Sequence, residues 1–144
     1  MSVFRQTVRD TLYAHLVAFK AANPTMVTGD VYRARPGSFV APCIYIGGLS
    51  EPRIVQSGGA GSGVRSRQMR PTIVIVTRLI VPDETSQAED DLVDAFLDYM
   101  DANEHIAGGI IATESTQDTE LTLEGTVYSA TVITCRAEVA EGRS

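Results

Sequence analysis

The chain has 144 residues, a formal net charge of −6 at pH 7, 44% hydrophobic residues and 21% charged residues. This length and composition suit one soluble globular domain, and they exclude intrinsic disorder across the whole chain. No apolar run approaches the roughly 20 residues of a membrane-spanning helix, and the N-terminus shows no secretion pattern, so we expect neither membrane contact nor export.

The charge is divided unevenly along the chain. Residues 1–82 carry ten basic side chains and three acidic ones, whereas residues 83–144 carry fifteen acidic side chains and two basic ones. The two parts therefore have formal net charges of +7 and −13. Arginine outnumbers lysine eleven to one, and arginine suits bidentate contacts with carboxylate or phosphate groups. The division indicates a subunit with oppositely charged surfaces in different parts of its fold.

An amphipathic helix is predicted over residues 2–22, closed by Pro24, which cannot continue a helix. Its apolar residues recur at spacings of three or four along one face: Phe4, Val8, Leu12, Leu16 and Phe19. Short strands are predicted next at Val31–Arg35 and Phe39–Ile46. Pro42 inside the second strand indicates an edge position, a bend or a late start of that strand.

A long β-hairpin is predicted after these strands, with arms at Arg53–Gln56 and Arg65–Val81. The Gly-rich run at 57–63 forms its flexible tip. Pro71 interrupts the second arm, so we expect the part before it to project from the sheet, with a flexible hairpin region at about 53–70. The four consecutive β-branched residues Ile73–Val76 are typical of a strand that is covered on both faces.

A second helix is predicted to begin near Ser86, which forms a capping box with Glu89. Its apolar stripe is Leu92, Val93, Phe96, Leu97 and Met100, and its other face carries Glu89, Asp90, Asp91, Asp94, Asp98 and Asp101. The last strands are expected at Ile110–Glu114, Glu120–Glu124 and Thr126–Ala140, with Asp118 and Gly125 at turns. This order predicts a single α+β domain over residues 1–144, with two helices packed on a mostly antiparallel sheet.

The sequence shows no catalytic motif. The Gly-rich run lacks the lysine and the following helix of a phosphate-binding loop. His15, expected to be packed or solvated on the first helix, and His105, expected at the end of the second, have no partner at metal-ligand spacing. Cys43 and Cys135 are interpreted as reduced thiols in the core. We therefore predict no catalytic residues, no cofactor and no metal site.

Two sets of charged residues are candidates for contacts with another subunit or partner. The first set lies beside the Gly-rich tip and consists of Arg53, Arg65, Arg67 and Arg70. It forms a solvated loop, an interface with acidic residues of another subunit, or a nucleic-acid contact. The second set, on one face of the second helix, consists of Asp90, Asp94, Asp98 and Asp101, and it is either solvated or binds a partner. An acidic protein is a poor general nucleic-acid binder, although a ring can present only its basic part to DNA.

The order of the elements carries a family resemblance. An amphipathic N-terminal helix is followed by a strand containing Ala41–Ile46 and by a long hairpin with a Gly-rich tip. An acidic helix containing Asp90–Leu97 and a terminal strand at Tyr128–Val139 complete the chain. In size and element order, over nearly its whole length, the chain resembles the tail terminator or tail completion proteins of long-tailed (siphophage-type) bacteriophages.

The resemblance implies a structural virion protein that forms a hexameric ring at the head-proximal end of the tail tube. Such a subunit contacts its own copies, the tail tube protein and the head–tail connector protein, and DNA passes through the ring without specific binding. It is assembled in the host cytoplasm and ends in the neck region of the virion, and it is not an enzyme. Two alternatives stay open: another neck component, such as a head-closure or minor tail protein, and a small cytosolic ligand-binding domain or enzyme.

Overall fold

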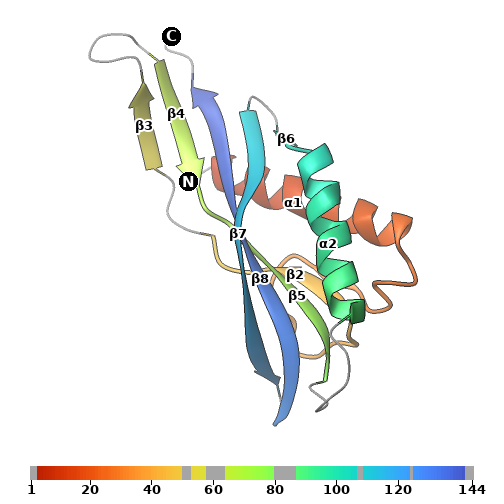
Figure 1. The fold of residues 1–144 in the computed structure, drawn as a ribbon. Coiled ribbons are helices and arrows are strands. Elements are labelled where there is room, and N and C mark those ends of the chain that lie inside the picture. The colour runs from red at the N-terminus through yellow and green to blue at the C-terminus, as the bar shows by residue number, and fades with distance from the viewer. Residues whose placement is uncertain are drawn as a thin grey trace.

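The computed structural model describes residues 3–49, 53–57, 64–79, 87–106, 109–123 and 125–141. Its helices are α1 (Val3–Ala22) and α2 (Gln87–Ala102). Its strands are β1 (Val31–Tyr32), β2 (Cys43–Ile46), β3 (Arg53–Ser57), β4 (Val64–Met69), β5 (Thr72–Leu79), β6 (His105–Ile106), β7 (Gly109–Leu123) and β8 (Thr126–Glu141). Both helices lie on the same side of a long, twisted sheet (Figure 1). The fold is therefore α+β, as predicted.

Strand β8 is the centre of the sheet. It pairs along one edge with β7, and along its other edge first with β5 and then with β4. Strand β2 continues the sheet beside β5, β1 beside β2, and β3 beside β4. Strands β1 and β2 are parallel, whereas the other pairs are antiparallel. The sheet is thus mixed, and the prediction of a mostly antiparallel sheet is wrong, because residues 33–42 return the chain to the same end of the sheet before β2 begins.

One extended stretch of the chain supplies β4 and β5, with Arg70 and Pro71 between them. Met69 lies opposite Ala137 of β8, and the amide of Cys135 donates a hydrogen bond to the carbonyl oxygen of Pro71 over 2.9 Å. Proline lacks an N–H group but keeps its carbonyl acceptor, so the ladder continues past it. Residues 65–69 therefore remain paired with β8, and the expectation that this part leaves the sheet is wrong. The tip at 58–63 lies outside the described residues.

The main core lies between the two helices and the sheet. The five apolar residues predicted for the buried face of α1 are all buried in it, together with Leu92, Phe96 and Met100 of α2. The rings of Phe19 and Phe96 meet edge to face, with centroids 5.1 Å apart and planes at 88°. Such a contact stabilises a helix pair by about 0.5–1.5 kcal/mol beyond the area it buries.

A second, smaller cluster lies on the opposite face of the sheet. Alternate residues of Ile73–Val76 point into the main core and into this cluster, which confirms that β5 is covered on both faces. The cluster is covered by the segment between β1 and β2, where the ring of Phe39 lies 4.8 Å from that of Tyr128. Its buried members are Cys43, Tyr45, Val74, Val76 and Ala130.

Several element boundaries differ from the predicted ones. Strand β2 begins directly after Pro42, so the late start is the correct alternative. Asp118 lies in the middle of β7 and not at a turn, because residues 115–123 of β7 pair continuously with β8 beyond a bulge at residue 114. Gly125 does occupy the predicted turn, with a φ of 79° that favours glycine. Helix α2 ends at Ala102, where the side-chain amide of Asn103 donates to the carbonyl of Tyr99 over 2.7 Å, so His105 lies in β6 beyond the helix.

Candidate assembly surfaces

The first surface is the acidic face of α2. Asp90, Asp94, Asp98 and Asp101 are all exposed, because the apolar stripe on the other side of the helix is buried against α1 and the sheet. Asp101 accepts a hydrogen bond from the hydroxyl of Thr113 on β7 over 3.5 Å. Within the part of the chain that the structure describes, no hydrogen bond or ion pair is formed by Asp90, Asp94 or Asp98. Three negative charges therefore project from this face of α2, and none of them is paired with a cation among the described residues.

The basic residues of the predicted hairpin occupy positions on both faces of β3 and β4. Position 65 lies opposite Glu141 of β8, and position 67 lies opposite Val139. Both positions are on the helix side of the sheet, the side of the buried pair formed by Met69 and Ala137. Arg53 pairs with Gln68, which is next to position 67 in β4. Because successive residues of a strand alternate between the two faces, position 53 is on the other side of the sheet. The strand register therefore places positions 65 and 67 on one face of the sheet and position 53 on the opposite face.

Arg70 contacts another strand of its own subunit through its side chain. It follows β4 directly, and its Nε donates a hydrogen bond to Oε1 of Glu114 on β7 over 2.9 Å. Its side chain and that of Glu114 are both partly exposed, so this ion pair contributes about 0–1 kcal/mol to stability. Arg70 thus has a partner within its own subunit, which the spacing of the arginines did not predict.

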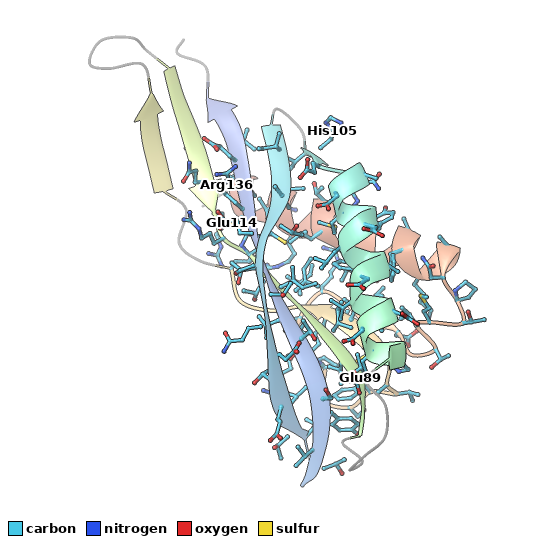
Figure 2. All side chains as sticks on the ribbon, viewed as in Figure 1. Glu89, His105, Glu114 and Arg136 are labelled. Carbon is cyan, nitrogen blue, oxygen red and sulfur yellow. The ribbon has the colours of Figure 1, made fainter. Side chains whose placement is uncertain are left out.

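The sequence analysis did not identify the acidic side of β7 as a surface. Asp118 lies opposite Thr131, whose hydroxyl donates to Asp118 Oδ1 over 2.9 Å, and Glu120 lies opposite Ser129. The hydroxyl of Ser129 in turn donates to Glu89 at the beginning of α2 over 3.1 Å. Figure 2 shows Glu89 at that end of α2 and His105 beyond the other end. The acids of β7 and α2 therefore share the helix side of the sheet, a grouping that follows from the β7–β8 register.

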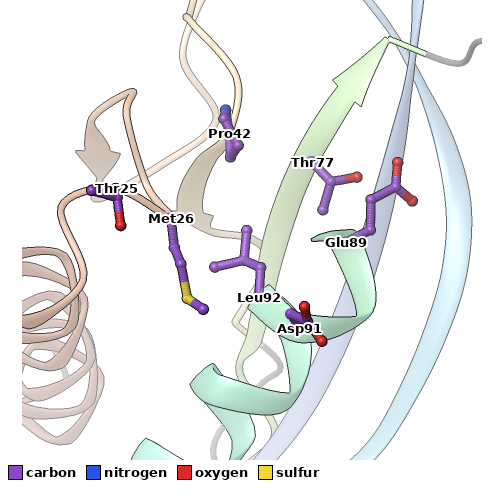
Figure 3. Close-up of a pocket in the computed structure, with 7 residues that line it drawn as sticks. All are labelled: Thr25, Met26, Pro42, Thr77, Glu89, Asp91 and Leu92. Atoms are coloured by element: carbon purple, nitrogen blue, oxygen red, sulfur yellow. The ribbon is translucent and has the colours of Figure 1, made fainter. Parts of the chain in front are cut away.

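A pocket of about 360 Å³ lies between the beginning of α2, β5 and the segment that follows α1 (Figure 3). It has an apolar part and two carboxylates, and its lining residues are Thr25, Met26, Pro42, Thr77, Glu89, Asp91 and Leu92. The hydroxyl of Thr77 donates to the carbonyl of Ser129 over 3.0 Å and is therefore engaged in the fold. These lining residues include neither a histidine nor a cysteine.

Both cysteines and His15 lie in or beside the core. Cys43 and Cys135 are free and buried, as predicted, and burial raises the pKa of each thiol to about 12. His15 is half-buried between the helices, where its Nδ1 lies 3.4 Å from the hydroxyl of Tyr99, and burial lowers its pKa. Among the described residues, no group of three or more His, Cys, Asp or Glu side chains is placed to hold a metal ion.

Neither described helix is both long enough and apolar enough to cross a membrane. A comparison with protein-family models finds no match for the chain, and a search of curated proteins finds none either. The arrangement of charge on the fold is therefore the main structural guide to function.

Proposed function

We propose that the chain is a structural subunit of a phage tail, a terminator that forms a ring at the head-proximal end of the tail tube. The ring ends tube polymerisation and provides the interface to the head connector. The proposal draws the identity of the assembly from the resemblance in size and element order. The observation that carries self-assembly is the acidic face of α2, where Asp90, Asp94 and Asp98 have no cation among the described residues.

In this proposal each subunit meets its neighbour head to tail. A heterologous ring brings different surfaces of adjacent copies together, so the acidic face of one copy can lie against the basic β3–β4 part of the next. Opposite charges at such an interface guide docking and specificity more than they raise affinity. The proposed ring is a hexamer with a lumen through which DNA passes.

The decisive experiment is electron microscopy of particles produced without this chain. A terminator predicts tails of abnormal length, because polymerisation of the tube no longer stops at the correct point. Full heads that leak DNA beside tails of normal length would instead assign the chain to head closure. Particles indistinguishable from the complete ones would contradict both roles.

A second experiment measures the mass of the purified chain in solution, at low and high salt and with isolated tail tubes. We expect ring-sized particles at low salt or on the tubes, and their loss at high salt, because ionic screening weakens contacts between exposed charges. A chain that stays monomeric under all these conditions and never binds tubes or connector rings would contradict the proposal.

The pocket beside α2 favours a second candidate function, a small ligand-binding domain. Its two carboxylates and apolar wall suit a compact organic cation. A panel of small amines and guanidines, tested for a rise in the unfolding temperature, checks this alternative, and Asp91→Asn should abolish any such rise. If no compound raises the unfolding temperature, the ligand-binding alternative is rejected and the structural role is favoured.

A further inference from the structure

Strand β7 presents a long open edge in the described part of the sheet. Strand β6 covers only Gly109 and Ile110, and the amide of Ile111 donates to the carbonyl of Glu104 over 3.0 Å. From residue 112 to residue 123, no described strand pairs with this edge. At the opposite margin of the sheet, β3 pairs with β4 and with no other described strand. The subunit therefore offers two strand edges, and an open edge is a template for pairing with another chain.

Pairing between two copies of β7 is disfavoured by charge. The strand carries Glu114, Asp118 and Glu120 and has no basic residue along its 15 positions. An antiparallel pair of β7 strands would bring acids of one copy close to acids of the other, and like charges across a strand pair are destabilising. A basic strand is accepted by the same edge without that penalty. The acidic residues of β7 therefore disfavour pairing with a second β7 strand and favour pairing with a basic strand.

We propose that β3 of one copy pairs with the open edge of β7 in the next copy, so that the sheet continues from subunit to subunit. This inference rests on the proposed function, because it requires that the chain associates with itself. The strand directions agree with it. Strand β7 is antiparallel to β8, β8 to β4, and β4 to β3, so a copy that continues the sheet meets β7 with an antiparallel β3.

The charges of the two edges fall on the same face of the continued sheet. Asp118 and Glu120 are opposite Thr131 and Ser129, on the side of the sheet that carries the helices. Positions 65 and 67 of β4 are on that side as well, opposite residues 141 and 139 of β8. In the continued sheet, β4 of the added copy is two strands from β7, about 10 Å away. An arginine side chain and a carboxylate side chain span this distance together.

The acidic face of α2 adjoins the same edge. The hydrogen bond from Thr113 to Asp101 places the end of α2 against β7, and the one from Ser129 to Glu89 places its beginning beside the acids of β7. A basic β3–β4 pair that docks on β7 therefore approaches both groups of acids. The strand edge supplies backbone hydrogen bonds and alignment, and the side-chain charges supply selectivity.

The test is a charge exchange between two variants of the full chain. One variant carries Asp118→Arg with Glu120→Arg, and the other carries Arg65→Glu with Arg67→Glu. Each variant alone has like charges at every contact, so its association should weaken by about a hundredfold. Mixed in equal amounts, the variants have opposite charges at every contact between unlike copies, so they should form rings again in which the two variants alternate. Analytical ultracentrifugation at low salt measures the result.

A matched control variant carries Gln117→Arg with Thr119→Arg, which adds positive charge to the other face of the same strand. It should associate nearly as well as the original chain, and circular dichroism of all variants checks that they fold. Two results would overturn the inference while leaving the ring proposal intact. The first is that each variant alone forms rings as well as the original chain does. The second is that the variants do not associate, either alone or in the mixture, although the original chain does. An original chain that never associates, alone or on tail tubes, would overturn both.

Discussion

Replacing Asp94 by lysine should stabilise the isolated subunit while weakening its assembly. Asp94 lies four residues from Asp90 and four from Asp98, and the described residues place no cation beside it. Each like-charge pair at this spacing destabilises a helix by about 0.2–0.5 kcal/mol, and an opposite-charge pair stabilises it by a similar amount. Asp94→Lys exchanges two repulsions for two attractions, so the free energy of unfolding should rise by roughly 1 kcal/mol.

Urea denaturation of the monomeric chain measures this change. With a slope of about 2 kcal/mol per molar urea, the unfolding midpoint should rise by about 0.5 M. Asp10→Lys is the matched control on α1, because Asp10 accepts a hydrogen bond from the guanidinium of Arg33 over 2.6 Å. There the new lysine faces a cation, so the midpoint should fall instead. At 1 M salt, where charges are screened beyond about 3 Å, both shifts should shrink.

The result that refutes this reasoning is a lower midpoint for Asp94→Lys at low salt. It would mean that the acidic face of α2 stabilises the subunit itself, and the main support for self-assembly would disappear. A raised midpoint with unchanged association would have a narrower consequence. It would confirm the electrostatics of the helix and remove Asp94 from the interface.

Three further predictions concern the interior. Phe96→Ala empties a fully buried site and should lower the free energy of unfolding by about 3–5 kcal/mol; a loss below 1 kcal/mol in urea would contradict the packing of α2. Burial lowers the pKa of His15, so as the pH falls its imidazole is protonated in the unfolded chain at a higher pH than in the folded chain. Stability should therefore fall as the pH drops below about 6.5, and His15→Gln should reduce that dependence in thermal unfolding at pH 5 and pH 7.5. Burial raises the pKa of Cys43 and Cys135 to about 12. A thiol reagent at pH 8 should therefore label neither residue in the folded chain and both in urea, and rapid labelling of the folded chain would refute their burial.

The elements predicted correctly from the sequence are those whose periodicity is fixed by burial. Helix α1 has an apolar residue at every third or fourth position, and all five of those residues are buried. The run Ile73–Val76 has no alternation at all, and β5 is indeed covered on both faces. In both cases the spacing of apolar residues within the segment indicates which of its faces are buried. The element can therefore be predicted without knowing which distant segment packs against it.

The features that were missed depend on pairing between distant segments. Residues 114–120 are polar and include Ser, Thr, Gln and Asp, which alone resemble a turn. They form a continuous strand because β8 supplies a partner along nearly its whole length. The same long-range pairing decides which face each charge occupies. The acids of α2 were found from helical spacing, whereas the acidic side of β7 required the register.

The double pairing of β8 has a consequence for local opening of the fold. Its middle, around residues 130–133, lies between β5 and β7, and both faces of the sheet are covered there. Its last residues pair with β4, beyond the second cluster. Backbone amides in the middle should therefore exchange hydrogen only on global unfolding, whereas those near the end exchange through smaller openings. The middle of β8 therefore serves as an internal control in hydrogen-exchange measurements, because exchange there reports global unfolding. A partner bound at the β3–β4 edge should slow exchange at the end of β8 alone.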